Sequence, residues 1–176
     1  MRSTVSLDVR IHGTAAEVWA FLWDAEALGR VLPGCESIRA ESPGRYRVVL
    51  AMRATLLTVR ADATATLHEP DPLRAVRLTL DGTPRGLGGT FHVEIPIALA
   101  EETGPDGALT RIEYDVDARV TGSMAAFGPG ILRDAIVREV EGLAADIERE
   151  IEAGRVAVPG QDGGTGAAAP AEGGRR

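Results

Sequence analysis

The chain has 176 residues, 44% of them apolar and 26% charged, which is enough for one globular domain with a buried core. Its formal net charge of −7 argues against a nucleic-acid-binding protein, because such proteins present a basic face to phosphates. The chain contains no lysine, which excludes lysine Schiff-base chemistry, and its single cysteine, Cys35, excludes an intramolecular disulfide and a multi-cysteine zinc site.

The two ends of the sequence differ in character from its middle. The first residues carry no apolar signal-peptide stretch, and no run approaches the ~18 apolar residues of a membrane span. We therefore expect a cytoplasmic protein that is not integral to a membrane. From Gly154 to Arg176 the chain is mostly glycine, alanine and proline, which cannot bury enough surface to offset the entropy of ordering. The sequence predicts one domain over residues 1–153 and a disordered tail over residues 154–176.

The first predicted elements are a strand and two short helices. Apolar residues alternate with polar ones over residues 6–11, as in a strand with one buried face. Thr14 and Glu17 then have the spacing of a capping box, which predicts a helix over residues 15–22. A second short helix is predicted over residues 24–30.

Alternation of apolar and polar residues recurs through the middle of the chain and predicts an antiparallel sheet that is covered on one face only. The predicted strands cover residues 36–41, 45–53, 57–67, 76–80, 91–99 and 111–120. Glycine- and proline-containing turns separate them, and the stretch from Asp81 to Gly89 is predicted to form a longer loop. Pro96 lies inside a strand pattern, which indicates an edge position or a bulge.

The last predicted element is a long helix from about Pro129 to Ala153, with Gly154 suited to its end. Its apolar residues recur at spacings of three and four: Leu132, Ile136, Val140, Leu143, Ile147 and Ile151. No other predicted element is long enough to cover the apolar face of the sheet. We therefore predict an α+β helix-grip fold, in which a curved antiparallel sheet of about seven strands surrounds the C-terminal helix.

One helix rarely fills the whole concave face of such a sheet, so we expect a ligand cavity near the short helices. One strand carries three small residues on its inward face, Ala61, Ala63 and Ala65. These residues either leave open space there or let the helix approach the sheet closely. The inward face of the strands carries no aspartate or glutamate, and no histidine is predicted inside. We therefore expect no catalytic and no metal site. Inward Tyr46 and Tyr114 either polarise a carbonyl ligand or belong to the core.

Three segments resemble those of known families. Ala16–Leu22 (AEVWAFL), with the element order, resembles the START-like (SRPBCC, Bet v 1-like) superfamily. Val31–Ile38 (VLPGCESI) resembles the LPGC segment of the CoxG proteins, which are subunits of carbon monoxide dehydrogenase. Gly122–Gly128 (GSMAAFG) resembles the G-x-L-A-x-L-G segment before the last helix of that family. The resemblance covers about residues 3–150, and residues 52–55 (MRAT) depart from the Val-Gly-Pro-like turn of many relatives.

The resemblance implies a helix-grip domain without enzymatic activity of its own. Such proteins accompany molybdenum-containing carbon monoxide dehydrogenases and related hydroxylases, which they recruit to the membrane or supply with a quinone. Some relatives carry an apolar C-terminal anchor that this tail lacks, so the membrane contact implied here is peripheral, at the inner face of the cell membrane.

We accordingly expect a bound quinone or lipid and no covalently attached cofactor. The apolar residues expected to line the cavity are Leu32, Pro33, Met52, Ala63, Phe91, Tyr114, Met124, Phe127 and Ile131. Two alternatives stay open. One is a cyclase, aromatase or dehydratase that uses Tyr46 or Tyr114 with water. The other is an assembly factor with a filled core, which recognises a partner through its exposed loops.

Overall fold

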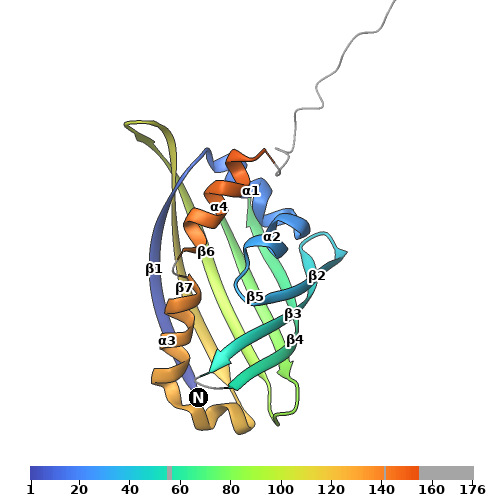
Figure 1. Cartoon of the computed structure of the whole chain (residues 1–176). Coiled ribbons are helices and arrows are strands. Elements are labelled where there is room, and N and C mark those ends of the chain that lie inside the picture. Colours follow the sequence, from blue (N-terminus) through green and yellow to red (C-terminus); the bar gives the residue numbers. More distant parts are fainter. Residues whose placement is uncertain (55–56, 141, 155–176) are drawn as a thin grey trace, which may run out of the picture.

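The computed structural model describes residues 1–54, 57–140 and 142–154 (Figure 1). Its centre is a seven-stranded antiparallel sheet in the order β1-β7-β6-β5-β4-β3-β2, which curves around the helices. The strands are β1 (Arg2–His12), β2 (Cys35–Ser42), β3 (Arg45–Ala54), β4 (Leu57–Asp71), β5 (Ala75–Pro84), β6 (Phe91–Gly104) and β7 (Gly107–Val120). The helices are α1 (Ala15–Trp23), α2 (Ala25–Val31), the 3-10 helix η1 (Gly122–Phe127), α3 (Gly128–Val140) and α4 (Leu143–Glu152). This architecture confirms the predicted helix-grip fold. Except for Gly154, the predicted tail lies outside the described residues.

Side-chain caps fix the two short helices after β1. The hydroxyl oxygen of Thr14 accepts a hydrogen bond from the backbone N–H of Glu17 at 3.2 Å, and the Glu17 carboxylate accepts one from the backbone N–H of Thr14 at 2.8 Å. The predicted capping box is therefore confirmed. Asp24 follows α1 and caps α2, because its carboxylate accepts hydrogen bonds from the N–H groups of Glu26 and Ala27, each at 2.9 Å.

The region predicted as a long loop before β6 is partly strand. β5 continues through Pro84, and Asp81 and Gly82 pair with His92 and Phe91 of β6. A β-carbon built on Gly82 would lie 2.3 Å from Cζ of Phe91, so the aromatic ring occupies the space that a side chain at position 82 would need. The expectation of a loop from Asp81 to Gly89 is therefore wrong for its first four residues. Glycine in this strand makes room for the ring.

Pro96 does not lie on an edge strand. β6 runs between β5 and β7, and Pro96 pairs with Arg77 of β5. On the other side, the pairing of β6 with β7 passes from Glu94 directly to Ile97 and skips Ile95 and Pro96. Because proline has no N–H to donate, the β6–β7 ladder is interrupted at this point.

The predicted single C-terminal helix is instead two helices. α3 ends at Val140 and α4 begins at Leu143, with Gly142 between them at φ 89°, a left-handed conformation that favours glycine. Ile147 of the predicted apolar stripe is buried against the core. Leu143 and Ile151 pack beside it. The side chains of Leu132, Ile136 and Val140 lie outside the described part of the structure.

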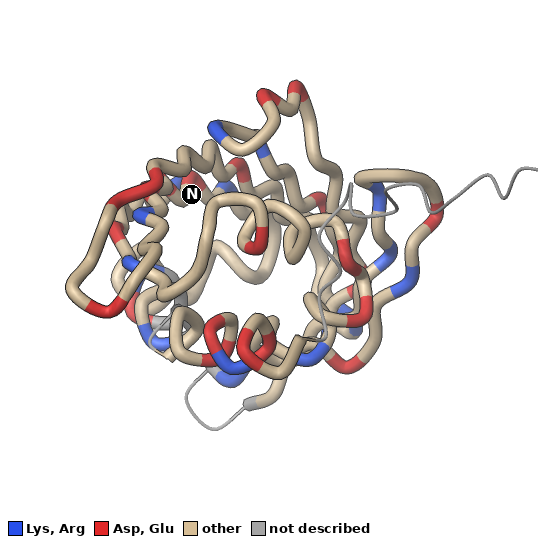
Figure 2. The backbone as a smooth tube through the Cα atoms, turned by 90° about the horizontal axis from the view of Figure 1, so that it is seen from above, with Lys and Arg blue, Asp and Glu red and all other residues tan. Residues whose placement is uncertain are grey.

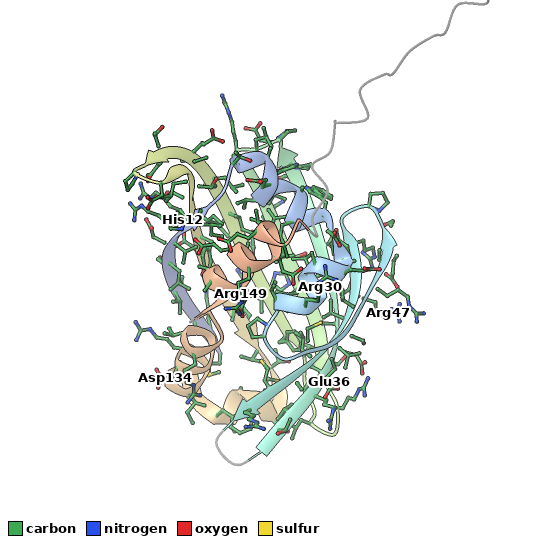
Figure 3. All side chains as sticks on the ribbon, turned by 45° about the horizontal axis from the view of Figure 1, so that its top comes forward. His12, Arg30, Glu36, Arg47, Asp134 and Arg149 are labelled. Atoms are coloured by element: carbon green, nitrogen blue, oxygen red, sulfur yellow. The ribbon has the colours of Figure 1, made fainter. Side chains whose placement is uncertain are left out.

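α4 is held in place by polar contacts to two other elements. The Glu148 carboxylate accepts a hydrogen bond from the backbone N–H of His12 at 2.7 Å and contacts Nδ1 of the same residue at 2.9 Å. Nε of Arg30, on α2, donates to the buried Glu150 side chain at 2.9 Å. His12 and Arg30 lie on either side of α4 in Figure 3. These contacts connect α4 to β1 and α2.

Candidate functional site

A cavity of about 370 Å³ lies between the concave face of the sheet and the helices. Seen from above, the sheet and helices close into a ring, with acidic and basic residues interspersed around it (Figure 2). The cavity is within the range of about 300–1,000 Å³ that is usual for small-molecule sites. Residues from all five helical segments and from strands on both halves of the sheet line it.

Among the described residues, the cavity lining is almost entirely apolar. Arg53 and Tyr114 are the two lining residues with a polar side chain, and no aspartate, glutamate or histidine belongs to the lining. The phenol of Tyr114 forms no hydrogen bond with a described residue, and burial raises its pKa above the ordinary value. Tyr114 is therefore protonated at neutral pH and can donate a hydrogen bond to a ligand oxygen.

Most of the residues expected from the sequence are brought together around this cavity. The lining includes Leu32, Pro33, Met52, Tyr114, Met124, Phe127 and Ile131. The LPGC segment supplies the first two from the end of α2, and the GSMAAFG segment supplies Met124 and Phe127 from η1. Both motifs that resemble the CoxG family thus contribute to the cavity wall.

The expectation is wrong for Ala63 and Phe91, which do not line the cavity. Both belong to a buried cluster with Ala61, Val120 and Met124. The physical reason is the position of the Phe91 ring, which lies against Gly82 and packs with the small alanine side chains. The alanines of β4 therefore accommodate core side chains instead of leaving open space.

Several lining residues were not singled out in the sequence. They are mainly branched apolar residues of the central strands: Leu78, Leu80, Val93, Ile95 and Ile97. The helical side of the cavity wall is completed by two residues of α1, Phe21 and Leu22, and three residues of α4, Leu143, Ala144 and Ile147. Their inward position follows from the period-two or helical pattern, but that pattern does not distinguish a residue facing open space from one facing a helix.

The remaining candidate chemical groups lie away from the cavity. Cys35 is half-buried, and burial raises the pKa of its thiol, so the reactive thiolate is disfavoured at neutral pH. Tyr46 is buried in a separate core cluster, where burial and the negative charge of Asp24 raise its pKa. His92 pairs with Asp81 at 2.6 Å and His68 contacts the Thr79 hydroxyl at 2.8 Å.

The described residues also bear on metal and membrane binding. Within residues 1–54, 57–140 and 142–154, no group of three or more histidine, cysteine, aspartate or glutamate side chains could hold a metal ion. None of the helices in the same residues is both long and apolar enough to cross a membrane.

Solved structures with the same fold come from several bacteria. A conserved protein from Geobacillus kaustophilus has a TM-score of 0.72 and 24% identity, with 87% of this chain and 96% of that chain covered. A START superfamily protein from Mycobacterium smegmatis has a TM-score of 0.63 and 15% identity, with 85% and 97% covered. The Zhui aromatase/cyclase from Streptomyces sp. R1128 has a TM-score of 0.62 and 18% identity, with 91% and 99% covered. Because all three identities are below 25%, these similarities establish that the chain has the START-like fold, and they do not assign it a function.

The sequence comparisons are more specific. Among curated proteins, no sequence matches the chain. The CoxG family, whose description names it as a subunit of carbon monoxide dehydrogenase, matches residues 8–152, which include both motifs and nearly every element of the fold. The chain therefore belongs to the CoxG family of carbon monoxide dehydrogenase subunits.

Proposed function

We propose that this chain is a carrier that binds a lipophilic small molecule, a quinone or a lipid, in the cavity and has no catalytic activity of its own. The observation that carries the proposal is the cavity lining, in which every described residue except Arg53 and Tyr114 has an apolar side chain. Burial of apolar ligand surface contributes about 25 cal/mol per Å². After association costs, a chain that fills the cavity would bind in the micromolar range.

The family supports a more specific role for the carrier. Its description names a subunit of carbon monoxide dehydrogenase, so we propose that the ligand serves a molybdenum-containing enzyme of that type. The carrier would take up a quinone at the inner face of the cell membrane, by peripheral contact, and deliver it to the enzyme. An apolar cavity suits this role because a quinone with an isoprenoid chain is nearly insoluble in water.

The test is native mass spectrometry of the full chain purified gently from its own host, followed by organic extraction. We expect a co-purifying quinone or lipid whose mass accounts for the difference between the native and denatured protein. A protein that is empty, and that also fails to bind added menaquinone and ubiquinone analogues, would overturn the carrier proposal.

A second candidate function is an aromatase or cyclase, which the inward Tyr114 hydroxyl and the shared fold with the Zhui enzyme favour. Replacing Tyr114 with phenylalanine separates the two functions. For a carrier we expect the dissociation constant of a short-chain menaquinone analogue, measured by calorimetry, to change by no more than about tenfold, because one neutral hydrogen bond contributes about 0.5–1.5 kcal/mol of net free energy. For an enzyme, the same substitution would abolish turnover of a polyketide-like substrate.

Tyr46→Phe is the matched control for this comparison. Tyr46 is buried but does not line the cavity, so its substitution should leave ligand binding unchanged. Any turnover that depends on Tyr114 but not on Tyr46 would favour the enzyme over the carrier.

A further inference from the structure

One end of the molecule is formed by segments that are far apart in the sequence. They are the start of β1, the end of β3, the start of β4, the loop between β5 and β6, η1 and the start of α3, which lie together at the lower end of Figure 1. Hydrogen bonds connect several of them. The N–H of Ser123 donates to the carbonyl oxygen of Gly88 at 2.8 Å, and the N-terminal amine of Met1 donates to that of Val120 at 2.9 Å.

The stretches of chain that reach this end carry arginines and no carboxylates. Residues 1–7, 49–54, 57–61, 82–93 and 118–133 contain no aspartate or glutamate, although the whole chain has a net charge of −7. Asp134 is the first carboxylate after the last of them. We call this surface the basic end, after its exposed arginines: Arg2, Arg53, Arg60, Arg85, Arg119 and Arg133.

Carboxylates further along the strands neutralise only part of this charge. Three ion pairs reach back from the basic end: Arg2 with Asp117, Arg60 with Glu36, and Arg85 with Asp62. Arg119 shares Asp117 with Arg2, at a distance of 3.8 Å. Arg53 and Arg133 form no ion pair with any described residue. The basic end therefore keeps an excess of positive charge.

The basic end also carries an exposed apolar side chain that belongs to the cavity wall. Among the described residues, Ile131 and Leu73 are the two large apolar side chains that are exposed, at 40% and 43%. Ile131 lines the cavity, as do the partly buried Met1, Met52 and Phe127 of the same end. The cavity wall therefore reaches the surface at the basic end.

An anionic lipid bilayer matches both features. Its head groups attract arginine side chains near the surface, and an apolar side chain among them can enter the boundary between head groups and acyl chains. A cavity wall that reaches the surface at the same place would pass a lipophilic ligand to or from the bilayer without exposing it to water. The phosphates of a nucleic acid would also attract the arginines, but they offer no favourable environment to an exposed isoleucine.

From these observations we propose that the basic end docks on an anionic lipid bilayer, with its arginines against the head groups and Ile131 inserted between them. The ligand then enters and leaves the cavity on the membrane side. The inference rests on the proposed function, and it adds which surface meets the membrane and which lipid charge that surface selects. Docking is reversible, because the negative charge of the rest of the chain opposes it.

The first test measures how much of the full chain sediments with sucrose-loaded vesicles at pH 7 and low salt. One set of vesicles contains dioleoylphosphatidylcholine alone, and the other contains equal parts of dioleoylphosphatidylcholine and dioleoylphosphatidylglycerol. We expect at least about fivefold tighter binding to the mixed vesicles. High salt should abolish the difference, because it screens exposed charges.

Arg133→Glu and its matched control Arg74→Glu assign the binding to one end. Both arginines are exposed, form no ion pair with a described residue and do not line the cavity. Arg74 lies at the opposite end, in the turn between β4 and β5. The two substitutions change the net charge equally. We expect Arg133→Glu to weaken binding to the mixed vesicles about tenfold, because it replaces an attraction with a repulsion, and Arg74→Glu to weaken it less than about twofold.

Ile131→Trp and Leu73→Trp test the insertion. Leu73 is as exposed as Ile131, but it lies next to Arg74 at the opposite end, two residues after Asp71. Phosphatidylcholine with bromine atoms on its acyl chains quenches only tryptophans that approach the chains. We expect brominated mixed vesicles to quench Ile131→Trp more than the wild type, whose tryptophans lie in α1. Leu73→Trp should behave as the wild type.

The outcomes separate this inference from the proposed function. The neutral fluorescent probe N-phenyl-1-naphthylamine reports on the cavity without vesicles, and Arg133→Glu and Arg74→Glu should bind it as the wild type does. A chain that binds neither the probe nor quinone analogues overturns the carrier. The carrier stands and docking by the basic end is overturned if the chain sediments equally with both vesicles, if Arg133→Glu and Arg74→Glu lose equal binding, or if Ile131→Trp is quenched no more than Leu73→Trp. Circular dichroism checks that each variant is folded.

Discussion

Replacing Val93 with tryptophan is expected to abolish ligand binding while the protein stays folded. Val93 lies near the start of β6, where it pairs with Leu80 of β5 and Ala118 of β7, and its side chain lines the cavity. An indole there would occupy the space that a ligand chain needs. We expect the affinity for N-phenyl-1-naphthylamine and for menaquinone analogues to fall at least tenfold, or about 1.4 kcal/mol.

The same substitution should have little effect on stability. Enlarging a side chain in a closely packed core costs about 1–3 kcal/mol, because its neighbours must move. At Val93 the added atoms enter a cavity of about 370 Å³ and make new contacts with its apolar walls. A thermal unfolding midpoint within a few degrees of wild type would confirm that lost binding comes from filled space.

Val49→Trp is the matched control for Val93→Trp. Val49 is on β3 between the inward residues Val48 and Leu50, so it faces the opposite side of the sheet and does not line the cavity. Its substitution should leave ligand affinity unchanged. Equal losses from both variants, or normal binding by Val93→Trp, would contradict the assignment of the cavity as the ligand site.

The strands were predictable from the sequence because this sheet has one apolar face. In β1 and β7, inward Leu7 pairs with Tyr114 and Val9 with Ile112, so each strand repeats the same alternation. A side-chain pattern of period two is the direct consequence of such a register. The family followed from short motifs, whose residues also contribute to the cavity wall.

The break in the C-terminal helix was not predictable from the same kind of pattern. Leu143, Ile147 and Ile151 continue the apolar spacing of the preceding segment, so the periodicity crosses Gly142 without interruption. Only the backbone conformation reveals that α3 and α4 are separate. A glycine inside a helical pattern allows such a break but does not require it.

The extent of the cavity depends on packing between distant segments. Ala63 and Phe91 both carry the inward parity, yet neither lines the cavity, whereas Val120 and Met124 of the same buried cluster do. Arg53 shows the opposite case, because alternation in β3 assigns it to the solvent face. It is nevertheless one of the residues that line the cavity, near the end of β3.

Gly34→Ala is expected to destabilise the protein strongly. Gly34 has φ 68°, and a β-carbon built on it would lie 2.3 Å from the carbonyl oxygen of Ala51. That backbone cannot easily move away, because the N–H of Ala51 donates to the carbonyl oxygen of Gly34 at 2.7 Å. The left-handed conformation alone costs an alanine about 1–2 kcal/mol, and the clash adds to it. We expect a loss of roughly 2–4 kcal/mol in the free energy of unfolding, measured by urea titration with tryptophan fluorescence.

Gly86→Ala separates the two causes of this loss. Gly86 has a similar φ of 75°, but a β-carbon there would meet no atom within 4 Å. Its substitution should cost only the conformational part, about 1–2 kcal/mol. The difference between the two variants therefore measures how closely the LPGC segment is held against β3.

The LPGC segment also bears on ligand binding, because its Leu32 and Pro33 line the cavity. Gly34→Ala should therefore also weaken the binding of N-phenyl-1-naphthylamine under conditions where the variant is still folded. Equal losses of stability from both variants would mean that the approach of Gly34 to Ala51 is not rigid, and that this segment does not fix the cavity wall.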